Sequence, residues 1–323
     1  SSEGEIMSKI SIVMPVYNEK ISWVEESIES ILNQSYKDFE LIIVLDNPQN
    51  DELKSVLEDV CSNHSKIKLL INDENLGIVD SLNKAITYSD GEYIARMDSD
   101  DIAFVDRLEK EINFLVNNNL DMVTSTVLEV DETGKSIISR AENDVIGKNF
   151  EHQIKYKTLG AHPTWLGKKD LFLKLGGYRN IAFAEDLDFI LRAIEQKFTI
   201  GLMGTPSLKY RIRSNSITSL NQLDMFETTI YLRRLFARRV LSATDSHEII
   251  KQLESIDDQD REKYQQISQQ RKKLFYLVKK NKISALVQFP QYMFVAMSNE
   301  YTRQLVVTDL TRILKKITST IFK

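Results

Sequence analysis

Two short acidic segments lie far apart in the sequence, and both carry residue types that could do chemistry. Asp98, Asp100 and Asp101 are close neighbours in the chain, and their mutual repulsion favours a bound cation. A hard divalent ion such as Mg²⁺ or Mn²⁺ takes oxygen ligands and can complete its coordination with the oxygens of a substrate diphosphate. Glu185 and Asp186 form the second segment, in which a carboxylate could act as a general base.

Both segments also have a purely structural interpretation. The first could cap a helix that starts near Phe104, because aspartate is a preferred residue at helix N-termini. The second opens a predicted helix from Glu185 to about Gln196, where carboxylates in the first turn favour the helix macrodipole. A short acidic motif does not decide between these interpretations by itself, so the surrounding elements matter.

Apolar runs alternate with amphipathic segments in the first part of the chain. The predicted strands are 10–16, 41–45, 67–71 and 92–97, and the predicted helices cover 22–34, 78–86 and 108–116. This alternation is typical of a doubly wound, mostly parallel α/β sheet, in which ligands bind beyond the carboxyl ends of the strands. Asp98 directly follows the fourth run, so we expect it at the ligand-binding edge.

The pattern changes after Asp121. The sequence predicts a hairpin with strands at 122–130 and 137–139, then the helix at Glu185, then two short strands at 198–203 and 208–212. Beyond Gly204 there is no glycine, and Pro290 is the only proline after Pro206. The last third of the chain should therefore be helical.

Composition limits the class of protein. The 323 residues are 42% hydrophobic and 28% charged, with eleven Gly and five Pro, which excludes disordered and collagen-like chains. Cys61 is the only cysteine, which excludes an internal disulfide and Cys-rich metal sites and favours a cytoplasmic location. Residues 1–6, ahead of Met7, show no signal sequence and are interpreted as a remnant of expression.

Charge is distributed unevenly along the chain. There are 24 basic against 37 acidic residues up to Asp224, and 18 against 10 after it. The acidic body argues against a nucleic-acid partner, whereas the basic tail could meet phosphates, a protein or an anionic membrane, or simply have solvated helix faces.

Within the tail, three lysines precede an apolar stretch at 283–297, and a second apolar stripe runs along 306–321. The stretch falls short of the roughly 20 residues needed to span a bilayer. It is compatible with peripheral contact at the inner face of the cell membrane. Packing against the catalytic body or against a second copy in a homo-oligomer is the alternative.

Several sequence blocks occur together in one order. They are Met-Pro-Val-Tyr-Asn-Glu at 14–19, Asp46, Asn75-Leu76-Gly77, Tyr93 to Asp101, His162-Pro163-Thr164, Gly176-Gly177-Tyr178, Glu185-Asp186 and Tyr210 to Ser216. In this order the chain resembles the family 2 glycosyltransferases over about residues 10–217. The resemblance implies a GT-A fold, with a Rossmann-like catalytic domain at 7–217 and a helical C-terminal region at 218–323.

The resemblance also implies an activity. Family 2 enzymes of this type move a sugar, with inversion, from a nucleotide-diphosphate donor, expected here to be a UDP-sugar, to a hydroxyl of a glycan or lipid-linked glycan. Capsule, O-antigen or another bacterial surface polysaccharide would be the product, and Mn²⁺ or Mg²⁺ the cofactor. A sugar-phosphate nucleotidyltransferase is one alternative, although a Gly-rich, Lys-containing phosphate loop is missing near the first strand. A catalytically degenerate scaffold is the other, and the retention of Asp100 and Asp186 argues against it.

The family pattern assigns roles to individual residues. Asp186, with Glu185, would be catalytic, and Asp100, with Asp98, would hold the metal. The nucleotide would be bound by Pro15, Val16, Tyr17, Glu19, Asp46, Asn75, Gly77, Lys84, Arg96, Asp98 and Ser99. The donor sugar or the acceptor would meet His162, Trp165, Asp188 and Arg213. A structural histidine and core packing are the alternatives for His162 and Trp165.

Three positions depart from the family pattern. Asn47 stands where a second acidic residue is common, which predicts unusual base recognition. Leu82 and Asn83 stand where Arg-Asn is common, so a cation that contacts phosphate would have to be Lys84 or Arg96. Arg213 stands where a histidine is common; it cannot ligate a metal but can form paired hydrogen bonds with phosphate. The sequence therefore predicts metal dependence less strongly than the full family pattern would.

Overall fold

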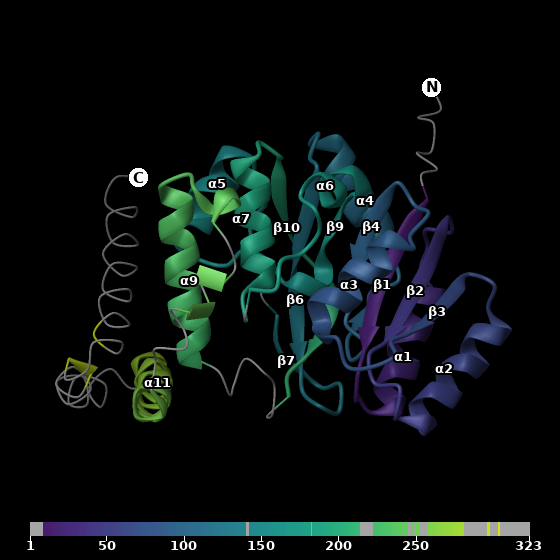
Figure 1. Ribbon diagram of the computed structural model, residues 1–323, viewed down its shortest axis with the longest axis horizontal. Helices are drawn as coiled ribbons and strands as arrows, with labels where there is room; N and C mark the ends of the chain where they lie inside the picture. The colour runs from purple at the N-terminus through teal and green to yellow at the C-terminus, as the bar shows by residue number, and fades with distance from the viewer. Residues whose placement is uncertain are drawn as a thin grey trace. The chain divides into compact units, whose positions relative to one another are not determined.

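The computed structural model describes residues 9–139, 142–181, 183–213, 222–244, 247–248, 250–251, 257–280, 296–297 and 303. The chain divides into two compact units. The first comprises Ser1–Asn180, Glu185–Ser214 and Leu235–Ala243, and it contains the central sheet (Figure 1). The second comprises Ile181–Ala184, Asn215–Arg234 and Thr244–Lys323.

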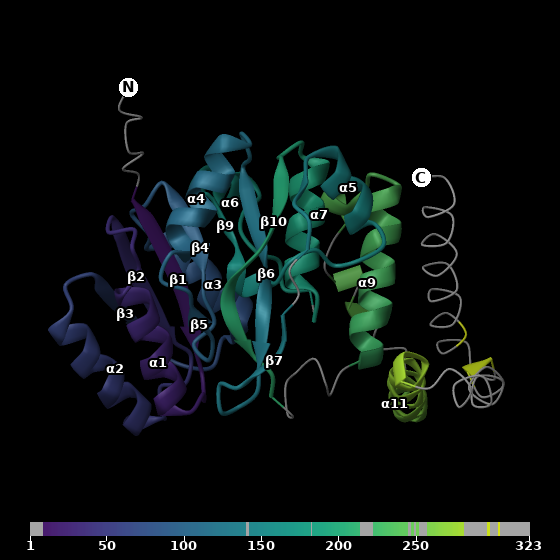
Figure 2. The same ribbon diagram turned by 180° about the vertical axis from the view of Figure 1, so that it is seen from behind.

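Within the described residues, ten strands form one mixed sheet with the order β3-β2-β1-β4-β9-β6-β10-β5, while β7 pairs with β6 and β8 with β10. Figure 2 shows this sheet from behind. The strands are β1 Ile10–Val16, β2 Phe39–Leu45, β3 Ile67–Ile71, β4 Tyr93–Arg96, β5 Ile102–Ala103, β6 Met122–Val130, β7 Ser136–Ser139, β8 Val145–Ile146, β9 Leu166–Lys168 and β10 Ile200–Arg211.

The first four strands are parallel and lie where the sequence predicted them. β1 pairs with both β2 and β4, and β2 pairs with β3. Val16 lies opposite Leu45, and Leu45 opposite Ile71, so the three strands end level with one another. Because parallel strands share one carboxyl edge, Asp46, Asn72 and Asp98 all leave the sheet at that edge.

Seven helices of the first unit accompany the strands within the described residues. They are α1 Ile21–Leu32, α2 Asp51–Asn63, α3 Gly77–Thr87, α4 Arg107–Asn117, α5 Lys148–Ile154, α6 Lys169–Lys174 and α7 Glu185–Glu195. The chain runs from β1 outward to β3 through α1 and α2, then returns to β4 through α3. Since crossovers between parallel strands are right-handed, this reversal puts α3 on the opposite face from α1 and α2. The β1–β4 boundary is thus the topological switch point, where ligands of such sheets bind.

The apolar pattern of the strands explains this packing. Ile12 and Met14 of β1 join side chains of α1, α2 and α4 in one buried core. Because successive strand residues point to opposite faces, the intervening Val13 turns toward the other face, and α3 packs against β1 and β2. A parallel sheet covered on both faces needs strands that are apolar throughout, and β2 is buried at every position.

The second half of the sheet departs from the sequence prediction in one respect. The hairpin of β6 and β7 is confirmed. The two short strands predicted at 198–203 and 208–212 are wrong, because they form the single strand β10, whose pairing with β6 shifts register between Met203 and Leu208. Pro206 lies in this shift; it has no N–H to donate, so it interrupts the hydrogen-bond ladder without ending the strand.

The described residues of the C-terminal region are mainly helical, as predicted. The helices are α9 Gln222–Ala237 and α11 Asp258–Lys280. Asp224 and Arg261 join them by an ion pair of 3.1 Å, and Phe226 packs on Tyr264 with ring centroids 5.4 Å apart. The apolar stripe predicted at 306–321 and most of the stretch at 283–297 lie outside the described residues. Among the residues described, no helix combines the length and the apolar character needed to cross a membrane.

Candidate active site

The loop that follows β1 is tied to the loop that follows β2. The Asn18 side-chain oxygen accepts hydrogen bonds from the amides of Asn47 at 2.6 Å and Asn50 at 3.2 Å. Within the first loop, the Tyr17 N–H donates to Glu19 Oε2 at 2.8 Å. Asn47 replaces the carboxylate common in the family, and a carboxylate could not donate this bond. The departure at position 47 therefore has a structural reason.

The predicted nucleotide-binding residues at the end of β1 differ in exposure. Tyr17 is exposed and Glu19 and Pro15 are half-buried, so their side chains have surface available at the switch point. Val16 is buried in the core. Any contact of Val16 with a nucleotide would therefore involve its main chain.

Asp46 orders the next loop of this edge. Its buried carboxylate accepts hydrogen bonds from the Asn72 side chain at 2.7 Å and from the N–H groups of Leu76 and Gly77, both at 2.8 Å. The Asn75 side chain also accepts from Gly77, at 3.1 Å. Gly77 has φ +84°, a conformation that residues with a side chain rarely adopt. Asp46 thus shapes the loop of Asn75 and Gly77, and a bond from Asp46 to a nucleotide base stays a prediction.

Lys84 is hydrogen-bonded to two oxygens of the chain. Its ammonium donates to Asn72 Oδ1 at 2.7 Å and to the Ile71 carbonyl at 3.2 Å. Through Asn72 it belongs to the same network as Asp46. Two oxygens thus hold the ammonium at the end of β3, and contact of Lys84 with phosphate stays a prediction.

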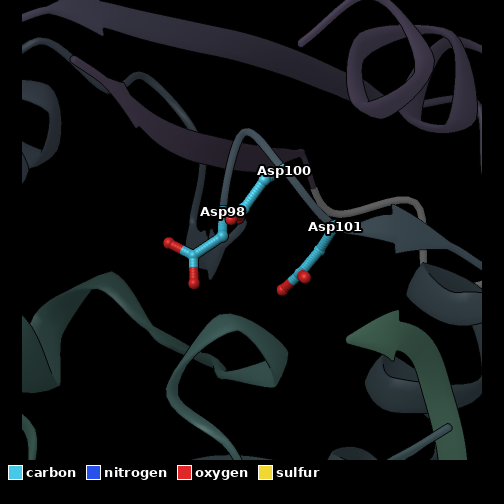
Figure 3. A group of neighbouring side chains, drawn as sticks. All are labelled: Asp98, Asp100 and Asp101. Atoms are coloured by element: carbon cyan, nitrogen blue, oxygen red, sulfur yellow. The ribbon is translucent and has the colours of Figure 1, made fainter. Parts of the chain in front are cut away.

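The first acidic segment forms a compact cluster after β4. Asp98, Asp100 and Asp101 each offer a carboxylate oxygen, and these oxygens lie within 4.8 Å of one another (Figure 3). Their side chains are 27%, 10% and about 1% exposed, respectively. Ser99 lies between them and is buried. We call these three aspartates the aspartate cluster.

Two arginines neutralise part of this charge. Arg96 Nη1 lies 2.7 Å from Asp98 Oδ2, and Arg213 Nε lies 2.9 Å from Asp100 Oδ2. Asp101 Oδ1 accepts the Arg211 N–H at 2.9 Å, whereas Asp101 Oδ2 is buried without a hydrogen-bond partner among the described residues. The alternative interpretation of the cluster as a helix cap is wrong, because α4 begins only at Arg107.

The electrostatics of the cluster suit a cation. Burial, together with the charge of Asp98, raises the pKa of Asp100 to about 6, although Arg213 acts in the opposite direction. Burial and the charges of Asp98 and Asp100 raise the pKa of Asp101 well above its ordinary value. A divalent cation would relieve this repulsion, and carboxylate oxygens are the ligands that Mg²⁺ and Mn²⁺ prefer. The residues present therefore fit such an ion.

Arg211, at the end of β10, is a residue of this site that the sequence analysis did not single out. Its guanidinium donates to the Asp100 carbonyl at 2.9 Å and to Glu26 Oε2 at 2.7 Å. It also lies over the ring of Trp23, 5.0 Å from the centroid. Arg211 thus fastens the loop of the aspartate cluster to α1. Only its place in the Tyr210 to Ser216 block signalled it.

The second acidic segment forms the first turn of α7. Asp186 Oδ1 accepts the Leu187 N–H at 2.6 Å. Burial and the neighbouring charge of Asp186 raise the pKa of Glu185 to about 7, and burial also raises the pKa of Asp186. We call Glu185 and Asp186 the acidic pair.

The structure brings the acidic pair and the aspartate cluster together. The charge of Asp98 contributes to the raised pKa of Glu185, and Arg96 lowers the pKa values of both Glu185 and Asp186. Arg96 also forms the ion pair with Asp98, so one guanidinium acts on both groups. Because it is buried and already engaged with Asp98, Arg96 is an electrostatic link between the groups, and its contact with phosphate stays a prediction.

Asp188 has a different role from the one predicted. It is fully buried, its carboxylate accepts Arg192 Nε at 2.8 Å, and it forms a second ion pair with Arg179. Arg192 in turn donates to the carbonyls of Leu175 and Gly177, both at 2.9 Å. Contact of Asp188 with donor or acceptor is therefore excluded here, because its charge fastens α7 to the preceding turn.

An aromatic cluster supports the same region. Trp165 is buried, and its ring lies nearly parallel to that of Tyr178, with centroids 6.1 Å apart. His162 Nε2 lies 2.9 Å from the Tyr178 hydroxyl, and burial lowers the His162 pKa well below its ordinary value. Stacking of Trp165 on a sugar is therefore wrong, and His162 is held as a neutral structural histidine. In the sequence, Tyr178 was marked only as part of the Gly176-Gly177-Tyr178 block.

Asn83 explains the second departure from the family pattern. Its amide donates to the Tyr178 carbonyl at 2.9 Å and accepts the Tyr178 N–H at 2.8 Å. A Cβ atom on Gly177 would come within 2.4 Å of the same amide, so this turn accepts only glycine without rearrangement. Asn83 thus positions the turn that carries Tyr178.

These features define a class of protein. A doubly wound sheet continues into a mixed second half, with carboxylates after β4 and a further acidic pair at the start of α7, as expected for the GT-A fold. Residues 11–176 match the profile described as glycosyl transferase family 2. The chain belongs to this family and is a glycosyltransferase.

Relatives support the assignment over most of the chain. An uncharacterized glycosyltransferase of Methanocaldococcus jannaschii is 34% identical over 220 residues, which cover 67% of this chain and 76% of the relative. The O-antigen biosynthesis glycosyltransferase WbnJ of Escherichia coli is 33% identical over 239 residues, which cover 72% of this chain and 91% of WbnJ.

Solved structures agree on the fold. TarS 1–349 of S. aureus in complex with UDP-GlcNAc superposes with a TM-score of 0.57 over 75% of this chain and 69% of that chain, at 19% identity. At this identity the similarity concerns the fold alone. The GT-A fold predicted from the sequence is thereby confirmed.

Proposed function

We propose that this glycosyltransferase moves a sugar from a UDP-sugar to a hydroxyl of a glycan or lipid-linked glycan, with inversion at the anomeric carbon. One observation supports the proposal: the aspartates that follow β4 and the carboxylates that open α7 are close enough for the charge of Asp98 to act on Glu185. The aspartate cluster offers oxygens close enough to share one cation. In the acidic pair, burial raises the pKa of Asp186 and raises that of its neighbour Glu185 to about 7, toward the pH at which a general base is most effective.

The aspartate cluster would hold a divalent cation, Mn²⁺ or Mg²⁺. Such an ion supplies Lewis-acid stabilisation of the charge that develops on a departing diphosphate, worth several kcal/mol. Asp98 and Asp100 are the proposed ligands, and the unpartnered oxygen of Asp101 makes that residue a third candidate. The loop of Tyr17 and Glu19 and the loop that Asp46 orders would enclose the nucleoside.

Asp186 is the proposed base. Its carboxylate would accept the proton of the acceptor hydroxyl as that oxygen attacks the anomeric carbon from the face opposite the diphosphate. Because the displacement takes one step, without a covalent intermediate on the chain, the configuration inverts. Asp186 in turn raises the pKa of Glu185, since the two carboxylates repel each other.

The donor, the acceptor and the pathway are proposed from similarity. TarS, which shares the fold, was crystallised with UDP-GlcNAc, and WbnJ is described as an O-antigen biosynthesis enzyme. These support a UDP-sugar donor and a role in a bacterial surface polysaccharide, such as O-antigen or capsule. We propose that the enzyme acts in the cytoplasm and reaches a lipid-linked acceptor at the inner face of the membrane.

The direct test is the product of turnover. The protein is incubated with single UDP-sugars and Mn²⁺, with and without a chelator, and released UDP and pyrophosphate are measured separately. We expect slow, chelator-sensitive UDP release, with faster release when acceptor glycans are added. The anomeric configuration of the transferred sugar is then read from NMR couplings and should be opposite to that of the donor. Pyrophosphate release would instead support the nucleotidyltransferase alternative.

A further inference from the structure

Two arginines pair with the aspartate cluster, and they differ in exposure. Arg96, which pairs with Asp98, has a side chain that is only 4% exposed. Arg213, which pairs with Asp100, is 38% exposed. A buried guanidinium cannot leave its carboxylate without a large desolvation penalty, whereas one at the surface can exchange its partner for water at little cost.

The main chain around Arg213 also favours movement of this side chain alone. The Ile212 N–H is fixed to the Val130 carbonyl at 2.9 Å, so the strand is anchored up to the residue before Arg213. Arg211, two positions earlier, holds the Asp100 carbonyl independently of Arg213. Rotation of the Arg213 side chain would therefore leave the loop of the aspartate cluster in place.

Arg213 and a cation compete for the same atom. Arg213 Nε lies 2.9 Å from Asp100 Oδ2, which is the distance of a direct hydrogen bond. A divalent ion coordinated by that oxygen would meet the positive guanidinium at close range. The buried, unpartnered Asp101 Oδ2 in the same cluster is an independent indication that a ligand completes the site.

We propose that Arg213 is an internal counter-ion of the aspartate cluster, that a divalent cation must displace it from Asp100, and that the freed guanidinium then binds the diphosphate of the nucleotide. The inference rests on the cation site of the proposed function and adds a coupling to it. Cation and nucleoside diphosphate should bind cooperatively, because each makes the displaced position of Arg213 more favourable. Arg213 would then weaken binding of the cation alone and strengthen binding of the cation together with the nucleotide.

The test measures cation binding directly, without turnover. Free Mn²⁺ is quantified by electron paramagnetic resonance during titration of the full chain, with and without UDP. The variant Arg213→Gln should bind Mn²⁺ about tenfold more tightly than the wild type in the absence of UDP, since the competitor is gone. The factor by which UDP tightens Mn²⁺ binding should fall by about tenfold in the same variant.

Two further variants separate the explanations. Lys20→Gln also removes one positive charge, but the exposed Lys20 ammonium pairs with Glu132 and with none of the three cluster aspartates. Mn²⁺ binding by this variant should stay within about twofold of the wild type. Arg213→Lys keeps the charge and should stay within about threefold. Thermal unfolding of each variant confirms that it is folded.

The outcomes are distinguishable. Unchanged or weaker Mn²⁺ binding by Arg213→Gln would overturn the counter-ion role while leaving the cation site standing. An equal gain in Lys20→Gln would overturn it as well, because the effect would then be a general one of surface charge. Absence of Mn²⁺ binding from wild type and variants, with and without UDP, would overturn both the cation site and this inference.

Discussion

The aspartate cluster and the acidic pair are both groups of buried or half-buried carboxylates, yet their surroundings differ. Arg96 and Arg213 pair with the cluster, whereas none of the described residues forms an ion pair with Glu185 or Asp186. In the cluster, repulsion among three carboxylates adds to the effect of burial on the pKa of Asp101, and a bound cation can relieve this repulsion. In the acidic pair, burial is the main cause that raises the pKa of Glu185 to about 7, so this carboxylate can take up a proton near neutral pH. The surroundings of a carboxylate, more than its identity, thus separate ion binding from proton transfer.

Removal of the proposed base should have the largest effect. Asp186→Asn keeps the shape of the side chain but cannot accept the proton, so transfer should fall by about 10²- to 10⁴-fold. Binding of UDP with Mn²⁺ should stay within about twofold of the wild type, because the aspartate cluster is intact. Transfer is measured as UDP release in the presence of acceptor, and binding by calorimetry.

Asp170→Asn is the matched control for this substitution. Asp170 is exposed and pairs with Lys174 within α6, so its loss should leave turnover unchanged. Near-normal transfer by Asp186→Asn would show that the base is another residue, with Glu185 the next candidate.

Removal of a carboxylate of the aspartate cluster should have the next largest effect. It should weaken binding of the nucleotide, whereas loss of Asp186 affects transfer. Asp100→Asn should weaken Mn²⁺-dependent binding of UDP by about 100-fold, because a cation bound through fewer charged oxygens is held less well. Asp106→Asn is the control, because Asp106 is half-buried and pairs with Lys110. Calorimetric titration with UDP, with and without Mn²⁺, measures the effect. Equal UDP affinity in Asp100→Asn and the wild type in the presence of Mn²⁺ would remove Asp100 from the cation site.

Glu40 contrasts with both groups, because it is a buried carboxylate whose pKa is lowered. Burial acts to raise its pKa, but hydrogen bonds from Lys68 and Ser11 outweigh burial and lower the pKa to about 2. A lowered pKa stabilises the fold above the unfolded-state value of about 4.3, and this contribution is lost as the pH falls toward 2. Glu40→Gln should therefore lower the free energy of unfolding by about 1–3 kcal/mol at pH 7.

Urea unfolding at several pH values measures this effect. The difference between wild type and Glu40→Gln should narrow as the pH falls below about 4, and the exposed Glu58→Gln should change stability by less than about 0.5 kcal/mol. A difference that is independent of pH would show that packing, and not the charge of Glu40, is responsible.

The smallest expected effect is a shift in the pH profile. In the wild type, kcat/KM should fall as the pH drops through about 7, because the acidic pair takes up a proton there. Glu185→Gln leaves one titrating carboxylate, whose proton is no longer held by a second negative charge, so the acidic limb should move to lower pH by about one unit. Initial rates from pH 5 to 9 measure the shift. Complete loss of transfer would instead make Glu185 the base.

Much of the fold was accessible from the sequence. The first four strands and their helices follow from apolar periodicity, and the helix that begins at Glu185 was predicted from the same signal. The join of two short runs into β10 was not, because the register shift at Pro206 depends on pairing with β6. Local patterns report which residues face a core but carry no information on which distant strand provides the partner.

The candidate site was accessible only in part, and the errors share a cause. Trp165 and Asp188 have residue types suited to a sugar or an acceptor, but each is buried and packs or pairs within the chain. Conversely, Arg211 and Tyr178 shape the site without belonging to any pattern that marks them individually. Whether a polar side chain faces a ligand or a neighbour depends on its burial, which single-sequence reasoning does not supply.

The sequence by itself determined that acids would follow a strand and open a helix, because strand periodicity and parallel connections place such residues at one edge of the sheet. The tertiary structure alone decided which charges meet. Asp101 receives its hydrogen bond from Arg211, 110 residues further along the chain, and Asp100 receives its counter-ion from Arg213. Electrostatic interactions act through a few ångströms of space, so only the folded chain determines which carboxylate is neutralised and which is left to bind an ion or a proton.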